Sequence, residues 1–306
     1  MRVVVALGGN ALLRRGEPVD AGTQRRNVTT AVEALAGLAA SHELIVTHGN
    51  GPQVGLLALQ GDSFVQAAPY PLDVLGAETE GMIGYLLDQE LVNALGSRPV
   101  ATLLTQVIVD DADPAFRRPD KFVGPVFQDA TAHKLAADRG WTIAPDGRAW
   151  RRVVPSPEPR SIVELGTINL LLDAGVLVIC AGGGGIPVVI DREGRLRGVE
   201  AVIDKDRAAA LLAEGLAADA LLMLTDVPAV QAGFGSPNAR DLDDVRVDDL
   251  RDIAFAPGSM GPKVEAACRF AERTGGLSGI GALADAAAIL RGERGTRIRG
   301  RSEVTA

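Results

Sequence analysis

Short apolar runs alternate along this chain with longer segments of helical periodicity, and this alternation restricts the possible folds more than any other feature. Each run is an almost unbroken string of Val, Ile, Leu and Ala, as expected for a strand that is covered on both faces. Strands that alternate with helices in this way build βαβ units and a largely parallel sheet, so we predict an α/β fold. The predicted strands span residues 3–7, 43–47, 100–109, 176–181 and 220–224, and the predicted helices span residues 27–40, 53–60, 75–94, 162–173, 206–214 and 264–273.

One region, residues 111–159, interrupts this rhythm. It carries seven of the 17 prolines and both tryptophans, Trp141 and Trp150. Within it, a Pro-Asp-Gly turn between two short apolar stretches predicts a hairpin over residues 141–154. We interpret 111–159 as a small subdomain, a lid, inserted into a single domain of residues 1–306. The alternative is a long surface excursion. The end of the chain, residues 299–306, is expected to be frayed.

The charge balance and the cysteine content exclude several classes of protein. The 306 residues include 31 Lys and Arg against 39 Asp and Glu, a net charge of −8. An acidic chain without a basic block does not favour nucleic acid or an anionic membrane as its partner. The apolar N-terminal run is too short for a signal peptide, and no stretch approaches the ~18 apolar residues of a membrane-spanning helix. Two cysteines, Cys180 and Cys268, suggest neither a disulfide framework nor a zinc site. We therefore predict a cytoplasmic enzyme.

Glycine follows several of the predicted strands directly. The segments concerned are Gly8-Gly9-Asn10, Gly49-Asn50-Gly51-Pro52, residues 182–185 and, with a polar pair instead of glycine, Thr225-Asp226. The carboxyl ends of parallel strands meet at one edge of a sheet, where open α/β proteins bind ligands. Glycine lets a backbone N–H approach an anion closely, and a helix N-terminus adds partial positive charge. Each segment alone is most simply a turn, but together they predict an anion site.

Two lysines stand at the predicted starts of helices, where a cation is unfavourable. Lys205 precedes a helix rich in Ala and Leu, and Lys263 follows Pro262 at the start of another. The helix dipole makes an ammonium at this end unfavourable by about 0.3–1 kcal/mol. A bound polyphosphate would make the same ammonium favourable. The alternative is that each ammonium points into water. Asp206 is predicted to hold either ammonium in place or, alternatively, to cap its helix.

Other signatures of nucleotide or metal chemistry are missing from the sequence. The Walker pattern G-x-x-x-x-G-K-[ST] does not occur, so a P-loop is not indicated. The three histidines, His42, His48 and His133, have neither metal-ligand nor catalytic-triad spacing. His48, beside a glycine segment, is more simply a hydrogen-bonding residue than a catalytic one.

Eight strings of residues carry a family resemblance. They are Val-Ala-Leu-Gly-Gly-Asn-Ala (5–11), Thr-His-Gly-Asn-Gly-Pro-Gln-Val-Gly (47–55), Gly-Met-Ile-Gly-Tyr (81–85), Val-Val-Pro-Ser-Pro-Glu-Pro (153–159), Ala-Gly-Gly-Gly-Gly-Ile-Pro-Val (181–188), Val-Ile-Asp-Lys-Asp (202–206), Leu-Thr-Asp-Val (224–227) and Gly-Ser-Met-Gly-Pro-Lys-Val (258–264). In this order, and over nearly the whole chain, they resemble the amino acid kinase family, most closely its carbamate-phosphorylating branch. The resemblance implies a three-layer αβα sandwich around an open, mainly parallel eight-stranded sheet, with the inserted subdomain as a lid, and usually a homodimer.

The resemblance also implies a reaction. It is reversible phosphoryl transfer between ATP and carbamate, giving ADP and carbamoyl phosphate, with Mg²⁺ bound to the nucleotide rather than to protein side chains. In cells such enzymes mostly form ATP at the end of arginine fermentation. Carbamate already carries a nucleophilic oxygen, so no general base is required. Positioning and charge neutralisation then supply most of the acceleration.

By motif match, the resemblance also implies the residues of the site. Lys205 and Lys263 would contact the transferring phosphoryl group and the nucleotide phosphates, and Asp206 would organise the two lysines. Lys121 would reach down from the lid. The remaining assignments are Gly8, Gly9 and Asn10 along the phosphate path, Gly49, Asn50 and Gly51 at the carbamate end, and Asp226, Ser259 and Met260 beside the nucleotide.

Two residues depart from the usual pattern of the family. Phe122 stands where proline usually follows the lid lysine, which weakens the assignment of Lys121. Glu80 stands where glutamine is usual. If its carboxylate faces the site, it would weaken the binding of anionic substrates, whereas in a dimer interface or in solvent it would have no such effect.

Two other functions stay open at this point. One is a kinase of the same fold that acts on acetylglutamate or UMP, although an acceptor pocket for a base would favour aromatic residues, which are only 4% of this chain. The other is a non-catalytic nucleotide sensor. Lys205, Asp206 and Lys263 argue against a sensor, because such a protein has no need for lysines that neutralise a phosphoryl group.

Overall fold

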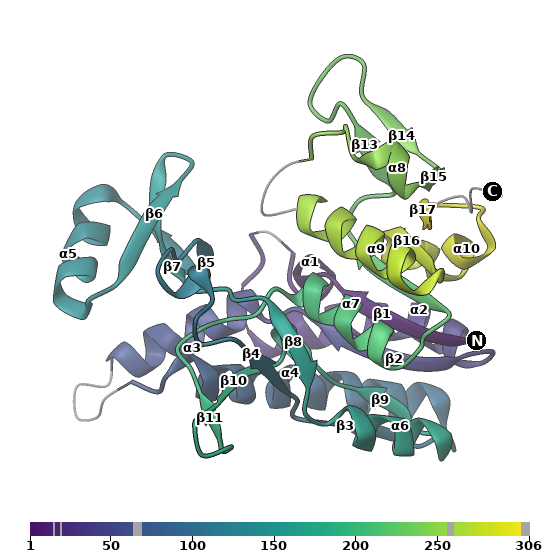
Figure 1. The fold of residues 1–306 in the computed structure, drawn as a ribbon, viewed down its shortest axis with the longest axis horizontal. Helices are drawn as coiled ribbons and strands as arrows, with labels where there is room; N and C mark the ends of the chain where they lie inside the picture. Colours follow the sequence, from purple (N-terminus) through teal and green to yellow (C-terminus); the bar gives the residue numbers. More distant parts are fainter. Residues whose placement is uncertain (15, 19, 64–68, 256–259, 301–306) are drawn as a thin grey trace.

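The computed structural model describes residues 1–14, 16–18, 20–63, 69–255 and 260–300. Its centre is an eight-stranded sheet (Figure 1). Six neighbouring strands run parallel, and the two strands at one edge run the opposite way. The predicted α/β fold with a mainly parallel eight-stranded sheet is confirmed. The strand order is β15 (Asp244–Arg246), β17 (Thr296–Arg299), β16 (Leu277–Ala282), β12 (Ala220–Thr225), β1 (Arg2–Leu7), β2 (Glu43–His48), β9 (Leu177–Ile179) and β3 (Val100–Thr102).

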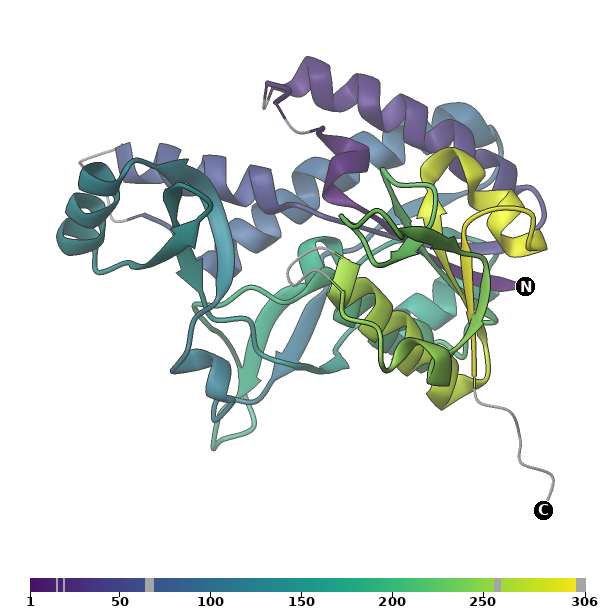
Figure 2. The ribbon, with the colours of Figure 1, turned by 90° about the horizontal axis from the view of Figure 1, so that it is seen from above.

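Helices cover both faces of this sheet and complete three layers (Figure 2). One layer consists of α2 (Ala21–Ala39), α4 (Leu72–Leu95) and α10 (Ala286–Arg291), and the other of α6 (Leu165–Asp173), α7 (Lys205–Gly215) and α9 (Met260–Thr274). Strand β1 contributes Val3, Val5 and Leu7 to the first core, and Val4 and Ala6 to the second. Successive side chains of a strand point to opposite faces, so a strand covered on both faces is apolar at every position.

A second sheet of four strands begins where the chain leaves the large sheet. Its order is β11 (Leu196–Gly198), β10 (Ile186–Ile190), β4 (Gln106–Val109) and β8 (Pro159–Ile162). The prediction of a single strand over residues 100–109 is therefore wrong, because β3 and β4 lie in different sheets. The chain changes sheet at Thr105, whose backbone N–H donates to the Glu80 side chain and whose carbonyl accepts from the Ile186 N–H.

The middle of the inserted region, residues 121–154, forms a body that projects from the rest of the molecule (Figure 1). It is a three-stranded sheet with one helix, in the order β5 (Lys121–Phe127), β7 (Ala149–Val154) and β6 (Thr142–Asp146), with α5 (Asp129–Arg139). The predicted hairpin is confirmed, since Asp146 pairs with Ala149, whereas α5 was not predicted. Trp141 packs inside this body, with the Phe127 ring 6.4 Å away and the Arg152 guanidinium 5.0 Å from its ring centre. Its action as a lid stays a prediction.

The remaining elements are short or lie beside the large sheet. They are α1 (Gly9–Leu12), α3 (Gly51–Ser63), α8 (Val247–Leu250), the hairpin of β13 (Val230–Ala232) and β14 (Arg240–Leu242), and three 3₁₀ turns at Pro114–Phe116, Gly182–Gly184 and Leu283–Asp285.

Three predictions about the chain as a whole have different outcomes. Arg299 is the last residue of β17 and pairs with Arg246, so the expectation of fraying is wrong for this residue. Residues 301–306 lie outside the described residues. Both Cys180 and Cys268 are free thiols. Within the ranges that the structure describes, the search for a helix long and apolar enough to cross a membrane finds none.

Candidate active site

A cavity of about 370 Å³ opens at the carboxyl edge of the large sheet. It is lined by the segments that follow β1, β2 and β12, by the first turns of α7 and α9, and by β5 of the inserted body. This volume lies in the range of small-molecule sites. The structure thus brings together most of the site residues inferred from sequence, namely Gly8, Gly9, Gly49, Asn50, Gly51, Lys121, Lys205, Asp206, Asp226 and Lys263.

Two glycines allow the loops of the cavity wall to interlock. Gly183 has a φ of +68°, and a side chain there would overlap the Asn50 amide. Gly49 lies so close to Gly9 that an added Cβ would stand 3.1 Å from the Gly9 nitrogen. Glycine is therefore strongly favoured at Gly183, and any side chain at Gly49 would press on the Gly9 backbone; the same lack of side chains lets the backbone approach an anion closely.

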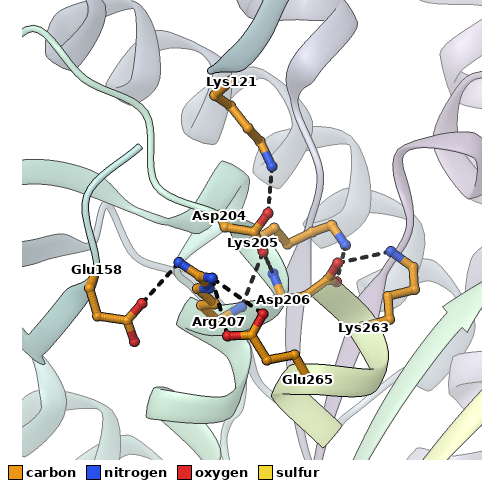
Figure 3. Close-up of polar contacts among 8 residues, drawn as sticks. All are labelled: Lys121, Glu158, Asp204, Lys205, Asp206, Arg207, Lys263 and Glu265. Carbon is orange, nitrogen blue, oxygen red and sulfur yellow. Dashed lines mark hydrogen bonds and ion pairs between the residues drawn. The ribbon is translucent and has the colours of Figure 1, made fainter. Parts of the chain in front are cut away.

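The centre of the cavity is a lysine–aspartate–lysine cluster, drawn in Figure 3. Lys205 Nζ lies 2.6 Å from Asp206 Oδ1, and Lys263 Nζ lies 2.9 Å from Asp206 Oδ2. Both lysine side chains are 14% exposed and the aspartate is 7% exposed. Burial opposes ionisation of Asp206, but the two ammonium groups outweigh it and hold the pKa of this carboxyl well below its usual range. Burial, followed by the Lys205 charge, lowers the pKa of Lys263.

Lys121, the first residue of β5, extends from the inserted body to the start of α7 (Figure 3). Its ammonium forms an ion pair with Asp204. Asp204 is also the N-cap of α7, because its Oδ1 accepts from the backbone N–H groups of Asp206 and Arg207 at 2.9 and 3.3 Å. The alternative that Asp206 caps this helix is therefore wrong: Asp204 caps it, which leaves both oxygens of Asp206 to the lysines.

The use of lysine in this chain is concentrated at the cavity. The sequence contains four lysines, and three of them, Lys121, Lys205 and Lys263, line the cavity. The fourth, Lys134, is exposed on α5. The lining also holds three aspartates, Asp204, Asp206 and Asp226, so positive charge exceeds negative charge only locally, where Lys205 and Lys263 share the one carboxylate of Asp206. That part of the cavity favours an anionic ligand.

Helix α4 supports the wall of the cavity that carries Asn50. Thr79, which is fully buried, accepts a hydrogen bond of 2.8 Å from the side-chain amide nitrogen of Asn50. The threonine hydroxyl in turn donates to the backbone carbonyl of Leu75 or Gly76, both 2.9 Å away. This chain of hydrogen bonds fixes the orientation of the Asn50 amide, because only its nitrogen can donate to the hydroxyl.

Glu80, the next residue of α4, lies neither in the cavity lining nor in solvent. It is 1% exposed; Oε2 accepts from the Thr105 N–H at 3.0 Å, and Oε1 has no hydrogen-bond partner within the described part of the chain. Burial, with the nearby Glu164 charge, raises the pKa of Glu80 well above its usual value. The sequence left two environments open for Glu80, the site on one hand and a dimer interface or solvent on the other. The structure shows neither, because the carboxyl is buried inside the chain, where its protonated form is favoured.

His48 has a structural environment. It is 1% exposed, its Nδ1 lies 3.3 Å from the Gly49 carbonyl, and burial lowers the pKa of its imidazole to about 4. A neutral, enclosed imidazole agrees with the predicted hydrogen-bonding role of His48.

We expect Glu80→Gln to change how stability depends on pH. The folded state holds the Glu80 proton above pH 4.5, the ordinary pKa of a glutamate, whereas the unfolded chain releases it. Stability then falls as pH rises toward the folded-state pKa, by up to about 1.4 kcal/mol per pH unit. Glutamine does not titrate, so the variant lacks this pH-dependent loss of stability, and its melting temperature relative to the parent should increase from pH 5 to pH 9. A difference in melting temperature that stays constant over this pH range would show that Glu80 does not retain its proton.

Three further residues were inferred from sequence, namely Met260, Asn10 and Ser259. Met260 begins α9 and packs against the core between α9 and the sheet. Asn10 is the second residue of α1. Ser259 lies outside the described residues. Phe122, the unusual neighbour of Lys121, itself lines the cavity and does not prevent Lys121 from reaching Asp204.

Sequence reasoning missed several residues that support the site. Asp204 carried a usable signal, because an aspartate directly before a helical run is a common N-cap. Thr79 carried none, since it occupies an ordinary position of a long helix and gains its contact with Asn50 only through folding.

The donor set around the cavity does not form a metal cage. In the ranges described, the structure has no group of three or more His, Cys, Asp or Glu side chains that could hold a metal ion. Asp204 and Asp206 are both engaged by lysines. With both carboxylates paired to lysines, the cavity suits a divalent ion that takes most of its ligands from phosphate oxygens, as Mg²⁺ usually does with a nucleotide.

The fold and the cavity together define an α/β protein with a ligand-sized cavity at the carboxyl edge of its parallel strands. A family model described as "Amino acid kinase family" matches residues 1–279. The chain belongs to the amino acid kinase family. Among its relatives are carbamate kinases of Rhizobium meliloti, 56% identical over 97% of this chain and 93% of that protein, and of Haemophilus influenzae, 53% identical over 99% and 98%. Within the family, the chain groups with the carbamate kinases.

Solved structures agree with this grouping. A carbamate kinase from Giardia lamblia bound to AMP-PNP superposes with a TM-score of 0.90 at 42% identity, covering 98% of both chains. An isopentenyl phosphate kinase of T. acidophilum, 15% identical with a TM-score of 0.53, shares the fold alone.

Proposed function

We propose that this protein catalyses reversible phosphoryl transfer between ATP and carbamate, giving ADP and carbamoyl phosphate. The observation that carries the proposal is the buried Lys205–Asp206–Lys263 cluster in a cavity walled by glycine loops. The relatives named carbamate kinase, at 45–56% identity, support the choice of acceptor. Acetylglutamate and UMP as acceptors, and a non-catalytic sensor, are not favoured.

The two lysines neutralise charge during transfer. In phosphoryl transfer, negative charge spreads over the three equatorial oxygens, and preorganised cations stabilise it. Asp206 holds both ammonium groups at one carboxylate, so they are ordered before the substrate arrives. The glycine loops, with Gly8 and Gly9, would receive the phosphates along the same wall.

The acceptor end requires binding rather than proton transfer. Carbamate is already an oxygen nucleophile, and no histidine is among the described residues that line the cavity. Asn50, with its amide fixed by Thr79, would orient the acceptor together with the backbone at Gly49 and Gly51. Orientation of two reactants can itself supply several kcal/mol of the barrier, roughly 7–11 in well-oriented systems. Asp226, Ser259 and Met260 would border the nucleotide.

The kinase membership implies a divalent metal, and we propose Mg²⁺. When bound, this ion neutralises β- and γ-phosphate oxygens. The chain's own contribution is the positive charge of Lys121, Lys205 and Lys263 around the same anion. We also propose that the enzyme works in the cytoplasm as a homodimer and mostly forms ATP, at the end of arginine fermentation.

An ATP-forming assay with ADP and carbamoyl phosphate tests the proposed reaction. Turnover should exceed that with ATP and acetylglutamate or UMP, measured with the same preparation. Faster turnover with either of those acceptors would contradict the proposal. Binding of ADP without turnover of any acceptor would instead support the sensor. Sedimentation velocity on the same sample tests the homodimer.

We expect Lys121→Ala to reduce kcat/KM without unfolding the protein. Lys121 is 37% exposed and bonds to a single partner, so its loss should leave the fold stable. A charge-assisted hydrogen bond contributes about 1.5–3 kcal/mol, which corresponds to a loss of roughly 10- to 100-fold in kcat/KM. Steady-state kinetics measure this, with Lys134→Ala as the control on the same inserted body. Unchanged kcat and KM would show that Lys121 does not act on the substrate.

A further inference from the structure

A second charged cluster lies outside the cavity lining, where α7 and α9 pack together. It consists of Glu158, Arg207, Glu214, Glu265 and Arg269. Figure 3 draws its members Glu158, Arg207 and Glu265. The mechanism proposed above uses none of these residues, yet two of them stand close in sequence to the cavity lysines. Arg207 follows Lys205 by two residues, and Glu265 follows Lys263 by two.

Glu158 uses both carboxylate oxygens, one for each helix. Its Oε2 lies 3.1 Å from Arg207 Nη1 on α7. Its Oε1 accepts a hydrogen bond from Arg269 on α9. Glu158 is 30% exposed, and the two arginines are 34% and 28% exposed, so the three groups are partly shielded from water. A carboxylate that bridges two arginines in this way fixes the spacing of the helices that carry them.

The two helices are also joined without Glu158. Arg207 Nη2 contacts Glu265 of α9 at 3.1 and 3.2 Å, and Arg269 Nε contacts Glu214 of α7 at 3.2 Å. Those ion pairs connect only α7 with α9. Glu158 differs from them because it belongs to neither helix.

The backbone of Glu158 belongs to the base of the inserted region. Its N–H donates to Asp113 Oδ2 at 3.0 Å, and Asp113 Oδ1 accepts from the Ala115 N–H at 2.8 Å. Asp113 and Glu158 stand at opposite ends of the insertion of residues 111–159, so this bond closes its base. The base is therefore connected, through one residue, to both helices that carry the cavity lysines.

We infer that Glu158 is a positioning residue that ties the base of the inserted region to α7 and α9. Lys205 and Lys263 at the helix starts and Lys121 on the inserted body then keep a common alignment around the phosphoryl group. Glu158 is not a catalytic residue, because it lies outside the cavity lining. The part of this inference that concerns alignment for catalysis rests on the proposed function, whereas the tether itself does not.

Hydrogen–deuterium exchange tests the tether without any substrate. Glu158→Ala removes both contacts, and Glu158→Gln removes the charge but keeps one acceptor. Exchange should accelerate at residues 111–120, 155–162 and 204–208, more in the alanine variant than in the glutamine variant. Glu265→Gln is the matched control, because it breaks an ion pair of the same Arg207 that does not involve the insertion. Exchange in Glu158→Ala equal to that of the parent, or equal to that of Glu265→Gln, would overturn the tether.

Kinetics test the consequence for alignment. Small displacements of reacting groups are costly, and we expect kcat of Glu158→Ala to fall by about tenfold while the KM for ADP is unchanged. Glu158 would act partly through Lys121. The loss of kcat in the double variant Glu158→Ala/Lys121→Ala should therefore be smaller than the product of the two single losses. Multiplicative losses, or a change in KM alone, would overturn the alignment role. If the parent enzyme does not turn over carbamoyl phosphate, the proposed function fails, yet the exchange experiment still decides the tether.

Discussion

Lys205→Ala should lose most of its turnover while retaining a folded structure. Lys205 is 14% exposed and pairs with Asp206, which keeps Lys263 as a second partner, so the variant leaves no buried charge alone. The rate should fall because one of two preorganised cations is missing when charge develops on the phosphoryl oxygens. Removal of a comparable electrostatic group costs about 2.7–4 kcal/mol, or roughly 10²–10³ in kcat.

The measurement is kcat for ATP formation from ADP and carbamoyl phosphate, together with thermal unfolding. Lys134→Ala is the matched control, since Lys134 is the one lysine of the chain that does not line the cavity. It should retain the parental kcat and melting temperature. A near-parental kcat in Lys205→Ala would refute its role in charge neutralisation, and with it the main support for the proposed mechanism.

Asp206→Asn should lose both stability and turnover. The carboxylate is 7% exposed and is the shared counter-charge of two ammonium groups that are each 14% exposed. Removing one member of a buried ionic group leaves uncompensated charge and costs about 3–5 kcal/mol. Turnover should fall as well, because Lys205 and Lys263 then repel each other and lose their common anchor.

The pH dependence of this loss has a definite sign. The pKa of Asp206 is held below its usual value of 3.8, so its stabilising contribution is complete above that pH and declines as the pH falls below it. The difference in melting temperature between parent and Asp206→Asn should therefore be largest near neutral pH and shrink below about pH 4. Pyrophosphate should raise the melting temperature of the variant more than that of the parent, because an anion replaces the lost charge. Equal melting temperatures at pH 7 would contradict the bridging role.

Much of the fold follows from local sequence signals. The strands of the parallel sheet are continuous apolar runs, and the segments after β1, β2 and β12 lie at one edge because parallel strands place their carboxyl ends together. The lysines at two helix starts were recognised because a cation there opposes the helix dipole. The residues alone left two roles open for Asp206, holding either ammonium or capping its helix, and the family resemblance implied that it organises both lysines.

Other features depend on contacts between distant parts of the chain. The run over residues 100–109 is apolar throughout, and only the bonds of Thr105 with Glu80 and Ile186 show where it changes sheet. The burial of Glu80 follows from the packing of α4 beneath the glycine loops. No local pattern distinguishes a buried glutamate of this kind from an exposed one on the same helix.

By itself, the sequence determined the α/β architecture with a largely parallel sheet, the glycine loops at one sheet edge and the lysines at two helix starts, because these depend on side-chain period and backbone freedom within a few residues. Only the tertiary structure decided that Lys121 pairs with Asp204, that Lys263 meets Lys205 at Asp206 and that Glu158 joins the insertion to two helices. The partners in these contacts are separated by as many as 111 residues, as for Arg269 and Glu158, and 83, as for Lys121 and Asp204. Their pairing is set by how the layers pack, which no short stretch of sequence encodes.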